Sequence, residues 1–412
     1  MDNLSHSVVG LAVGEFVHRR LPEESDIDRN RVRRRLLLIS GWLASNFPDL
    51  DLVLTPLLPE PLGYLLHHRG HTHTLLYAIP QALLLWAMIW MLWPAARRLL
   101  KQSGAARTGF ALTVCIGFVL HLLMDSLNSY GIHPFHPFDS RWFYGDMVFI
   151  VEPLFWIAFG VPVIMTVQRN SMKILLFALM LGALLFFTMK EFLPWTSVAL
   201  LIALALLLGV LQRKAGTRGT TAFVFSAIVG IGFIGMQALA SYQATQVLVR
   251  HLENKDPESR FLDGSMTSFP TNPLCWAFVS VESKEASGIY TLRRGVLSLA
   301  PGMTPVAECP AGFFDAAAQT AANPAIAFYS EQEGKLDTLR NLFAENCHFN
   351  AWMRFARVPL VNHDNATDIR FSSSPRGNFT TMNFDDFKDR ECARFIPDWN
   401  FPRSDLLTPS GR

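Results

Sequence analysis

The first 244 residues alternate between long apolar runs and short basic segments, whereas the following residues have the mixed pattern of a water-exposed domain. A helix needs about 20 apolar residues to cross the roughly 30 Å hydrocarbon core of a membrane. Eight runs approach this length, and the first two are short, so we expect those two to reach only part-way across or to pack inside the bundle. The predicted segments are residues 5–20, 34–47, 72–94, 108–128, 147–167, 172–189, 194–212 and 221–244.

Lysine and arginine gather in every second connection between these segments. If the segments alternate in direction, all of these connections lie on one side of the membrane, and the positive-inside rule makes that side cytoplasmic. Both termini then lie outside. The residues concerned are Arg19, Arg20, Arg29, Arg31, Arg33, Arg34, Arg35, Arg97, Arg98, Lys101, Arg107, Arg169, Lys173, Arg213, Lys214 and Arg218.

Residues 250–412 are expected to form an α+β domain. Alternating apolar positions predict strands over 276–281 and 288–292, the pattern of 336–349 predicts a helix, and 368–372 suggests a further strand. Four of the five cysteines lie here, and an even number in a domain placed outside suggests two disulfides. Three pairings are possible and the sequence does not choose among them; four reduced thiols in a cytoplasmic domain are the alternative. These cysteines are Cys275, Cys309, Cys347 and Cys392.

Composition supports this division. Half of the 412 residues are hydrophobic and only 17% are charged, which is too apolar for an ordinary soluble protein. The net charge of +2 gives no reason to expect a nucleic-acid partner, and the first twenty residues lack the basic start and cleavage site of a signal peptide. We predict a polytopic α-helical membrane domain with a C-terminal α+β domain. Residues 1–167 would be its membrane-embedded core, 168–249 additional transmembrane helices, and 250–412 a disulfide-linked extracytoplasmic domain.

Polar clusters interrupt the apolar pattern at the ends of the segments. Nine of the twelve histidines fall in the first 136 residues. In the alternating topology all of these clusters lie at the outer ends of the segments, opposite the basic connections, and ionisable groups in such positions are functional-site candidates. The clusters are His6, residues 46–51, residues 67–74, His121 with Asp125, and Asp146 with Glu152.

The residue types in these clusters are those that bind divalent metals. His121 and Asp125 are four apart, so on a helix their side chains share a face. Asp49 and Asp51 follow Pro48 in a loop that either directs both carboxylates to one site or lets one orient a ligand. Mixed histidine and carboxylate ligands suit zinc or manganese, and the number of candidates exceeds what one zinc needs. We therefore predict two or three divalent ions, zinc first and manganese second. The predicted ligands are His6, Asp49, Asp51, His68, His73, His121, Asp125 and Glu152.

Each cluster also has a structural interpretation. Residues 67–74 could be a polar cap on a transmembrane helix, and Asp49 with Asp51 a turn that caps a helix. His121 with Asp125 could form an interfacial hydrogen bond. The roles of His71, His133 and His136 stay open.

At these residues the sequence resembles the bacterial inner-membrane metal-dependent hydrolase family typified by YdjM. The family pattern has an N-terminal histidine, then Pro-Asp-x-Asp, His-Arg-Gly-x-Thr-His-Ser/Thr and His-x-x-x-Asp. The matching positions are His6, residues 48–51, residues 68–74 and residues 121–125, and the resemblance covers about the first 160 residues.

That family is in turn similar to zinc-dependent phospholipase C and P1-type nucleases, which bind three zinc ions. The resemblance implies that His121 and Asp125 match their helical His-x-x-x-Asp pair, and His6 their early histidine. Asp49 or Asp51 would match the bridging aspartate and Glu152 the late glutamate. These relatives also use the amine of an N-terminal tryptophan, whereas this chain begins Met1-Asp2.

These observations predict an integral membrane phosphoesterase that acts on a lipid phosphate at the outer face of the bacterial inner membrane. Asp49 or Asp51 would be the general base, and Arg69 would stabilise negative charge on the phosphoryl oxygens. One alternative is a metal or proton transporter with a His/Asp site. Another is a scaffold with a structural metal. The sequence does not give the oligomeric state.

Overall fold

The computed structural model describes residues 1–313, 320–371, 377–388 and 390–408. These form two compact units. The first consists of residues 1–50, 72–128 and 148–236; the second consists of residues 51–71, 129–147 and 237–412. The second unit therefore combines the C-terminal domain with two segments from the first third of the chain.

All eight predicted apolar segments form helices. Among the described residues, five helices are long and apolar enough to cross a membrane: α4 (Leu75–Leu92), α6 (Gly104–Ser126), α8 (Asn170–Met189), α9 (Trp195–Ala215) and α10 (Thr221–Lys255). The other three are α1 (Asn3–Arg20), α2 (Ile27–Ala44) and α7 (Pro153–Met165). A short helix, α5 (Pro94–Gln102), joins α4 to α6. The fold is thus a polytopic helical membrane domain with a C-terminal α+β domain, as predicted.

Three of the expected boundaries differ clearly, and one of them is the end of α10, which runs to Lys255 and not to residue 244. Helix α2 begins at Ile27, so the arginines from Arg29 to Arg35 lie within the helix and not in the preceding connection. Arg33 is buried there. Hydrogen bonds from its guanidinium to the carbonyl of Pro22 and to the Asn30 side chain compensate for the loss of water. Helix α7 is shorter than the predicted segment 147–167, since its first turn starts only after Glu152.

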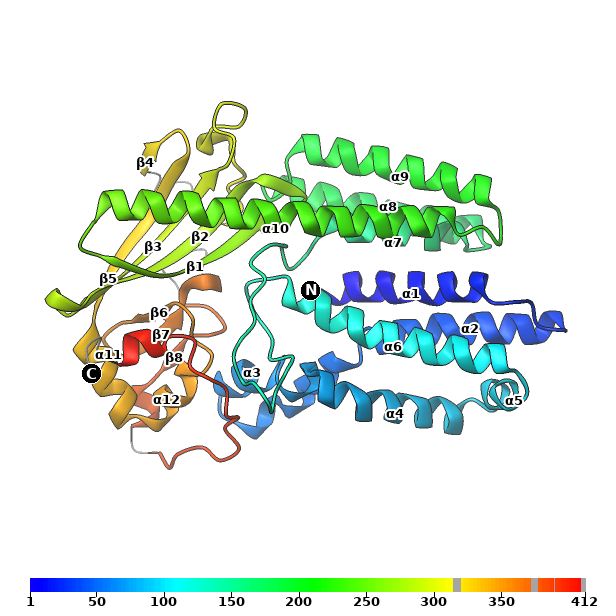
Figure 1. Ribbon diagram of the computed structural model, residues 1–412, viewed down its shortest axis with the longest axis horizontal. Coiled ribbons are helices and arrows are strands. Elements are labelled where there is room, and N and C mark those ends of the chain that lie inside the picture. Colours follow the sequence, from blue (N-terminus) through cyan, green and yellow to red (C-terminus); the bar gives the residue numbers. More distant parts are fainter. Residues whose placement is uncertain (314–319, 372–376, 389, 409–412) are drawn as a thin grey trace. The chain divides into compact units, whose positions relative to one another are not determined.

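The core of the first unit lies between α1, α2, α4, α5 and α6 (Figure 1). Leu36, Leu37 and Ala44 of α2 pack with Phe110 and Phe118 of α6. Helices α1 and α2 approach closely at two glycines, because a Cβ on either Gly10 or Gly41 would overlap the carbonyl oxygen of the other. This close packing brings the ends of α1, α2 and α6 together.

The second unit is built on an antiparallel sheet in the order β1-β2-β3-β5-β4. The C-terminal half of α10 packs on it through Ala244 and Leu248, which contact Trp276 and Phe278 (Figure 1). The strands are β1 (Arg260–Phe269), β2 (Asn272–Lys284), β3 (Ile289–Ser298), β4 (Thr320–Asn323) and β5 (Ile326–Lys335). A small sheet, β6 (Pro359–Val361), β7 (Asn365–Asp368) and β8 (Met382–Asn383), and helices α3 (Leu62–His67), α11 (Leu336–Glu345), α12 (Cys347–Met353) and α13 (Ser404–Leu407) complete the unit.

Expectations for the C-terminal domain hold in outline. Strands β2 and β3 contain the two predicted strands, but the predicted helix 336–349 is two helices, because Asn346 ends α11 and caps α12. The predicted strand 368–372 is wrong: β7 ends at Asp368 and a 3-10 turn, η6 (Ile369–Phe371), follows. Ser372 lies outside the described residues. Disulfides join Cys275 to Cys309 and Cys347 to Cys392, which selects one of the three possible pairings.

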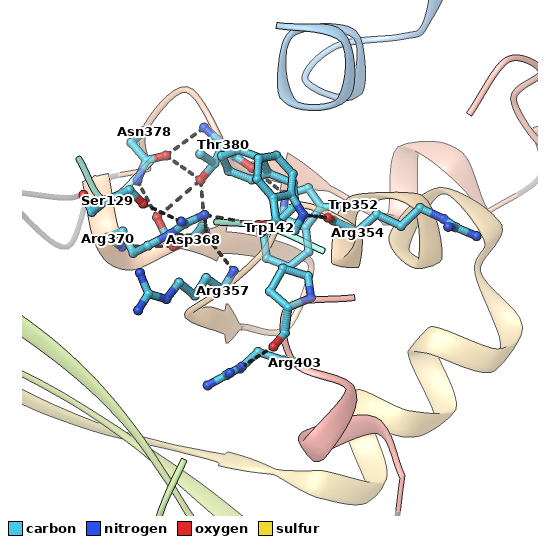
Figure 2. Close-up of polar contacts among 12 residues, drawn as sticks. Ser129, Trp142, Trp352, Arg354, Arg357, Asp368, Arg370, Asn378, Thr380 and Arg403 are labelled. Atoms are coloured by element: carbon cyan, nitrogen blue, oxygen red, sulfur yellow. Dashed lines mark hydrogen bonds and ion pairs between the residues drawn. The ribbon is translucent and has the colours of Figure 1, made fainter. Parts of the chain in front are cut away.

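Buried arginines tie the 129–147 segment to the rest of this unit. Arg370 pairs with Asp368 and donates to the carbonyl of Ser129, and the Trp142 indole donates to the carbonyl of Arg354 (Figure 2). Arg357 donates two hydrogen bonds to Asp146 and two to Asp263. Because these charges are buried, each needs its partner.

Candidate metal centre

Three separate stretches of the first unit bring four metal-binding side chains together. Asp49 comes from the start of a 3-10 helix, η1 (Pro48–Leu57), just after α2. His73 ends a second 3-10 turn, η2 (His71–His73), directly before α4, and His121 and Asp125 lie on the last two turns of α6. One potential ligand atom from each of the four residues lies within 4.8 Å of the others. Four potential ligand atoms this close together could hold a single metal ion.

The contacts within this group, which we call the His/Asp cluster (Asp49, His73, His121 and Asp125), are close. His73 Nε2 lies 3.3 Å from Asp49 Oδ1 and 3.1 Å from Asp125 Oδ2. His121 Nε2 lies 3.4 Å from the same Asp125 oxygen and 3.0 Å from His73 Nε2. The side chains of His73, His121 and Asp125 are fully buried, and that of Asp49 is 11% exposed. Two imidazoles and two carboxylates directed at one point fit a divalent ion such as zinc or manganese.

Hydrogen bonds outside the cluster orient both imidazoles. His121 Nδ1 lies 2.7 Å from the carbonyl oxygen of Ser45, so this nitrogen carries the proton and leaves the Nε2 lone pair for the cluster. His73 Nδ1 lies 3.0 Å from the Thr72 hydroxyl. Ser45 is the C-terminal cap of α2, where helix carbonyls have no partner within the helix. This role could not be predicted from the residue types, because every residue has a backbone carbonyl.

His6 reaches the cluster from the first turn of α1. Its Nε2 lies 3.2 Å from Asp125 Oδ1, and its ring stacks on that of His121 with centroids 4.1 Å apart. The Met1 amino group also donates to Asp125 Oδ1. The two oxygens of Asp125 therefore face different partners: Oδ2 faces His73 and His121, whereas Oδ1 faces His6 and the amine. Asp125 is therefore contacted through both of its oxygens.

Asp49 is held in its ionised form. Burial acts to raise its pKa, but the hydrogen bond with His73 outweighs this effect and the pKa falls to about 2. Its second oxygen accepts a hydrogen bond of 3.2 Å from the Asn3 amide. A carboxylate that is charged at neutral pH and fixed by a neighbour is ready to bind a cation.

Three other predicted site residues meet in the second unit. Asp51 is buried, and its Oδ1 accepts a hydrogen bond of 3.0 Å from His68 Nδ1. Its Oδ2 accepts one of 2.8 Å from the backbone N–H of Arg69. The Arg69 guanidinium lies 4.9 Å from the centroid of the Tyr130 ring, and the His68 ring stacks on Tyr64. Asp51 thus fixes both the ring orientation of His68 and the backbone at Arg69.

Glu152 lies in the first unit, immediately before α7. It is fully buried, and its carboxylate accepts a hydrogen bond of 3.1 Å from the Leu154 N–H as the N-terminal cap of α7. It is not one of the four residues whose ligand atoms converge. The structure therefore gathers His6, Asp49, His73, His121 and Asp125 in one unit, gathers Asp51, His68 and Arg69 in the other, and gives Glu152 a capping contact.

Comparison with known proteins finds similarity in the N-terminal part of the chain, which contains this site. Residues 1–194 match the family described as YdjM inner membrane protein. The chain is also similar to the uncharacterized protein YfhP of Bacillus subtilis (strain 168), with 24% identity over 158 residues. That alignment covers 38% of this chain and 44% of the relative, so the chain spans less than half of the curated relative that it matches. No solved structure matches the chain significantly.

The matched residues contain every member of the His/Asp cluster and three of the five helices that can cross a membrane, α4, α6 and α8. The chain is accordingly an integral protein of the inner membrane with a possible metal-binding group in its helical domain. Residues 1–194 are thus similar to the family described as YdjM inner membrane protein.

Proposed function

We propose that the protein is a membrane-embedded, metal-dependent phosphoesterase that hydrolyses a lipid phosphate at the periplasmic face of the inner membrane. The observation that carries this proposal is the His/Asp cluster, in which two imidazoles and two carboxylates converge within 4.8 Å. Two carboxylates and two fixed imidazole lone pairs are unfavourable together in a buried site unless a cation or protons compensate them.

The placement of the cluster supports a lipid substrate. His6 lies in the first turn of α1, whereas Arg19 and Arg20 lie in its last turn. His121 lies near the end of α6, whereas Arg107 lies in its first turn. In both helices the metal-binding residues are therefore at the end opposite to the arginines. The positive-inside rule then assigns the cluster to the periplasmic side, at the depth of the lipid headgroups.

The two disulfides support the same orientation. Disulfides persist in oxidising compartments such as the periplasm and are rare in the cytoplasm. Both bridges lie in the C-terminal domain, and Cys115 is the one cysteine of the chain outside them. If all eight predicted segments cross the membrane, the two termini lie on the same side, and the C-terminal domain would then be periplasmic, like the His/Asp cluster.

Two or three divalent ions, zinc before manganese, are the cofactors we propose. An ion held by the His/Asp cluster would lower the pKa of a bound water from 15.7 to about 7 and so supply hydroxide at physiological pH. Asp49, which accepts a hydrogen bond from Asn3, would accept the proton of that water. Arg69 would stabilise the negative charge that develops on the phosphoryl oxygens. Asp51 would act by positioning His68 and Arg69, since its two oxygens accept from these residues.

Metal content and phosphate release together test the proposal. The full chain is purified in detergent, its zinc and manganese are measured by elemental analysis, and phosphate release from phosphatidate is followed. Wild type and His18→Ala are expected to retain metal and activity, because His18 lies near the other end of α1 from His6. His121→Ala is expected to lose both. Activity that persists undiminished in His121→Ala would refute the proposal, and metal flux into liposomes without phosphate release would indicate a transporter.

A further inference from the structure

A polar pocket with a volume of about 830 Å³ lies at the end of the first unit that is opposite to the His/Asp cluster. Helices α1, α7 and α9 contribute their last turns to it, and α2 and α8 their first turns (Figure 1). On α1, Arg19 of the last turn lines the pocket, whereas His6, which contacts the cluster, lies in the first turn. Most of the lining side chains are charged or polar. The pocket is therefore a second polar site, separate from the candidate metal centre.

Ion pairs and hydrogen bonds fix the walls of this pocket. Glu15 is 2% exposed, and both of its oxygens are occupied. Its Oε1 accepts a hydrogen bond of 2.9 Å from Arg19 Nε, and its Oε2 accepts one of 2.7 Å from Arg34 Nε. Arg19 also donates to the carbonyl of Gly219 over 2.6 Å, and Arg34 donates to the Thr166 hydroxyl over 2.9 Å. These contacts join α1, α2, the end of α7 and the connection after α9, so the walls are held in place before any ligand binds.

Positive charge exceeds negative charge in the lining. Five of the lining side chains are lysine or arginine and two are glutamate, which leaves an excess of three positive charges. Glu15 is shared by two arginines, and Glu23 pairs with Arg218, both of them exposed. Among the described residues, no carboxylate forms an ion pair with Lys173 of α8 or Arg213 of α9. A pocket that gathers an excess of one sign of charge attracts a ligand of the opposite sign, here an anion.

The N-terminus of α8 adds backbone donors. Asn170, the first residue of this helix, lines the pocket, and Lys173 lies in the same turn. No side chain caps this end of α8, and its first turn contains no acidic residue. The first N–H groups of a helix have no partner within the helix, and the helix dipole favours negative charge beside them. Together with the basic side chains they suit a phosphate group.

Gln212 contributes an acceptor that has no donor. Its side chain lines the pocket, and the residue is 5% exposed. Its Nε2 donates to the carbonyl of Gly216 over 3.0 Å, whereas its Oε1 is buried and accepts no hydrogen bond from the described residues. A buried acceptor without a donor costs free energy. A ligand that carries a hydroxyl group beside its phosphate would supply this donor.

We propose that this pocket binds a glycerol phosphate group at the cytoplasmic face of the membrane. Lys173, Arg213 and the N-terminus of α8 bind the phosphate oxygens, and a hydroxyl of the glycerol donates to Gln212. The positive-inside rule assigns this end of the bundle to the cytoplasmic side, at the depth of the lipid headgroups. The group belongs either to an anionic phospholipid, such as phosphatidylglycerol, or to a soluble ester, such as glycerol 3-phosphate. Basic pockets between transmembrane helices bind anionic headgroups on that side of the membrane.

Binding to the full chain in detergent tests this proposal in two arms. Native mass spectrometry measures the dissociation constant of phosphatidylglycerol, and phosphatidylcholine with the same acyl chains is the zwitterionic control. Isothermal titration calorimetry measures the dissociation constant of glycerol 3-phosphate. If the ligand is a lipid, the wild type should bind phosphatidylglycerol more tightly than phosphatidylcholine. If the ligand is soluble, the wild type should bind glycerol 3-phosphate. Neither measurement depends on the phosphoesterase activity.

Two double variants separate the pocket from the charge of the surrounding surface. Lys173→Gln with Arg213→Gln removes two cations of the lining that have no carboxylate partner among the described residues. Arg35→Gln with Lys214→Gln removes two exposed cations that are next to lining residues in the sequence but lie outside the pocket. A basic residue beside an anionic lipid raises affinity about fivefold, so the first double variant should bind about 30-fold more weakly and the second less than about threefold. Exchanging the two lining cations, Lys173→Arg with Arg213→Lys, keeps the charge and should retain binding.

Weaker binding in the lining variant alone, in either arm, supports the pocket, and the arm in which it occurs identifies the source of the phosphate. Equal affinity for phosphatidylglycerol and phosphatidylcholine, together with no binding of glycerol 3-phosphate, would overturn the proposal. Equal weakening in the two charge-removing double variants would also overturn it, because the attraction would then come from the surface as a whole. Loss of binding in the variant with exchanged cations would show that charge in the pocket is not what the ligand recognises.

Discussion

Replacing Asp125 by asparagine should remove most of the metal-dependent stability of the protein. Asp125 is the centre of the predicted site: its Oδ2 faces His73 and His121, and its Oδ1 faces His6. Asp125→Asn keeps the size and shape of the side chain but removes the negative charge. Its effect on metal binding therefore reports the loss of one anionic ligand and not the creation of a cavity.

The expected magnitude follows from the number of ligands. A four-ligand zinc site binds with about 10–16 kcal/mol, so one ligand of the four accounts for about 3–4 kcal/mol. This corresponds to roughly 10²–10³ in the dissociation constant. At a zinc concentration of about 1,000 times the wild-type dissociation constant, zinc adds about 4 kcal/mol to the free energy of unfolding. A variant whose zinc affinity is about 300-fold weaker gains only about 1 kcal/mol at the same concentration.

The assay is thermal or denaturant unfolding of the full chain in detergent, with and without added zinc. Glu15→Gln is a matched control, because Glu15 is also a buried carboxylate of the first unit but pairs with Arg19 and Arg34. This control should be less stable than the wild type in both conditions, since two arginines lose their partner, yet it should keep the full zinc increment. An undiminished increment in Asp125→Asn would refute the proposed metal centre, and so would loss of the increment in Glu15→Gln.

Two further predictions concern the framework that holds the sites. Arg357→Met should lower the free energy of unfolding by about 3–5 kcal/mol, because it removes the guanidinium that Asp146 pairs with and leaves Asp263 with Arg403 as its cation; a loss below about 1 kcal/mol in denaturant unfolding would contradict this. Gly41→Ala should reduce the yield and melting temperature of folded protein, since its Cβ would overlap the α1 backbone, whereas Gly182→Ala on α8, with no atom within 4 Å of its Cβ, should have no such effect. Equal melting temperatures for the two glycine variants would show that the helices move apart at little cost.

The sequence alone was sufficient for the helices and for part of the metal centre. Apolar runs of membrane length predict helices because a backbone in hydrocarbon has to satisfy its own hydrogen bonds. The pair His121 and Asp125 could be assigned to one face from its spacing alone, because side chains four apart align on a helix. Each of these inferences uses only residues that are close together along the chain.

Tertiary structure decided which of the neighbouring candidates converge. Asp49 and Asp51 lie on a 3-10 helix, in which the side chains of residues two apart point about 120° away from each other. Asp49 therefore joins the His/Asp cluster, whereas Asp51 binds His68 and the Arg69 backbone.

Tertiary structure also decided contacts that no residue type in the sequence identifies. The Ser45 carbonyl orients His121 only because α2 ends beside α6, and the pairing of the four bridged cysteines depends on which strands and helices lie together. The polar pocket at the ends of α1, α2, α7, α8 and α9 is likewise a property of packed helices. Contacts between residues far apart in the chain depend on how whole elements pack. A local pattern of residue types contains no such information, because the same pattern is compatible with many packings.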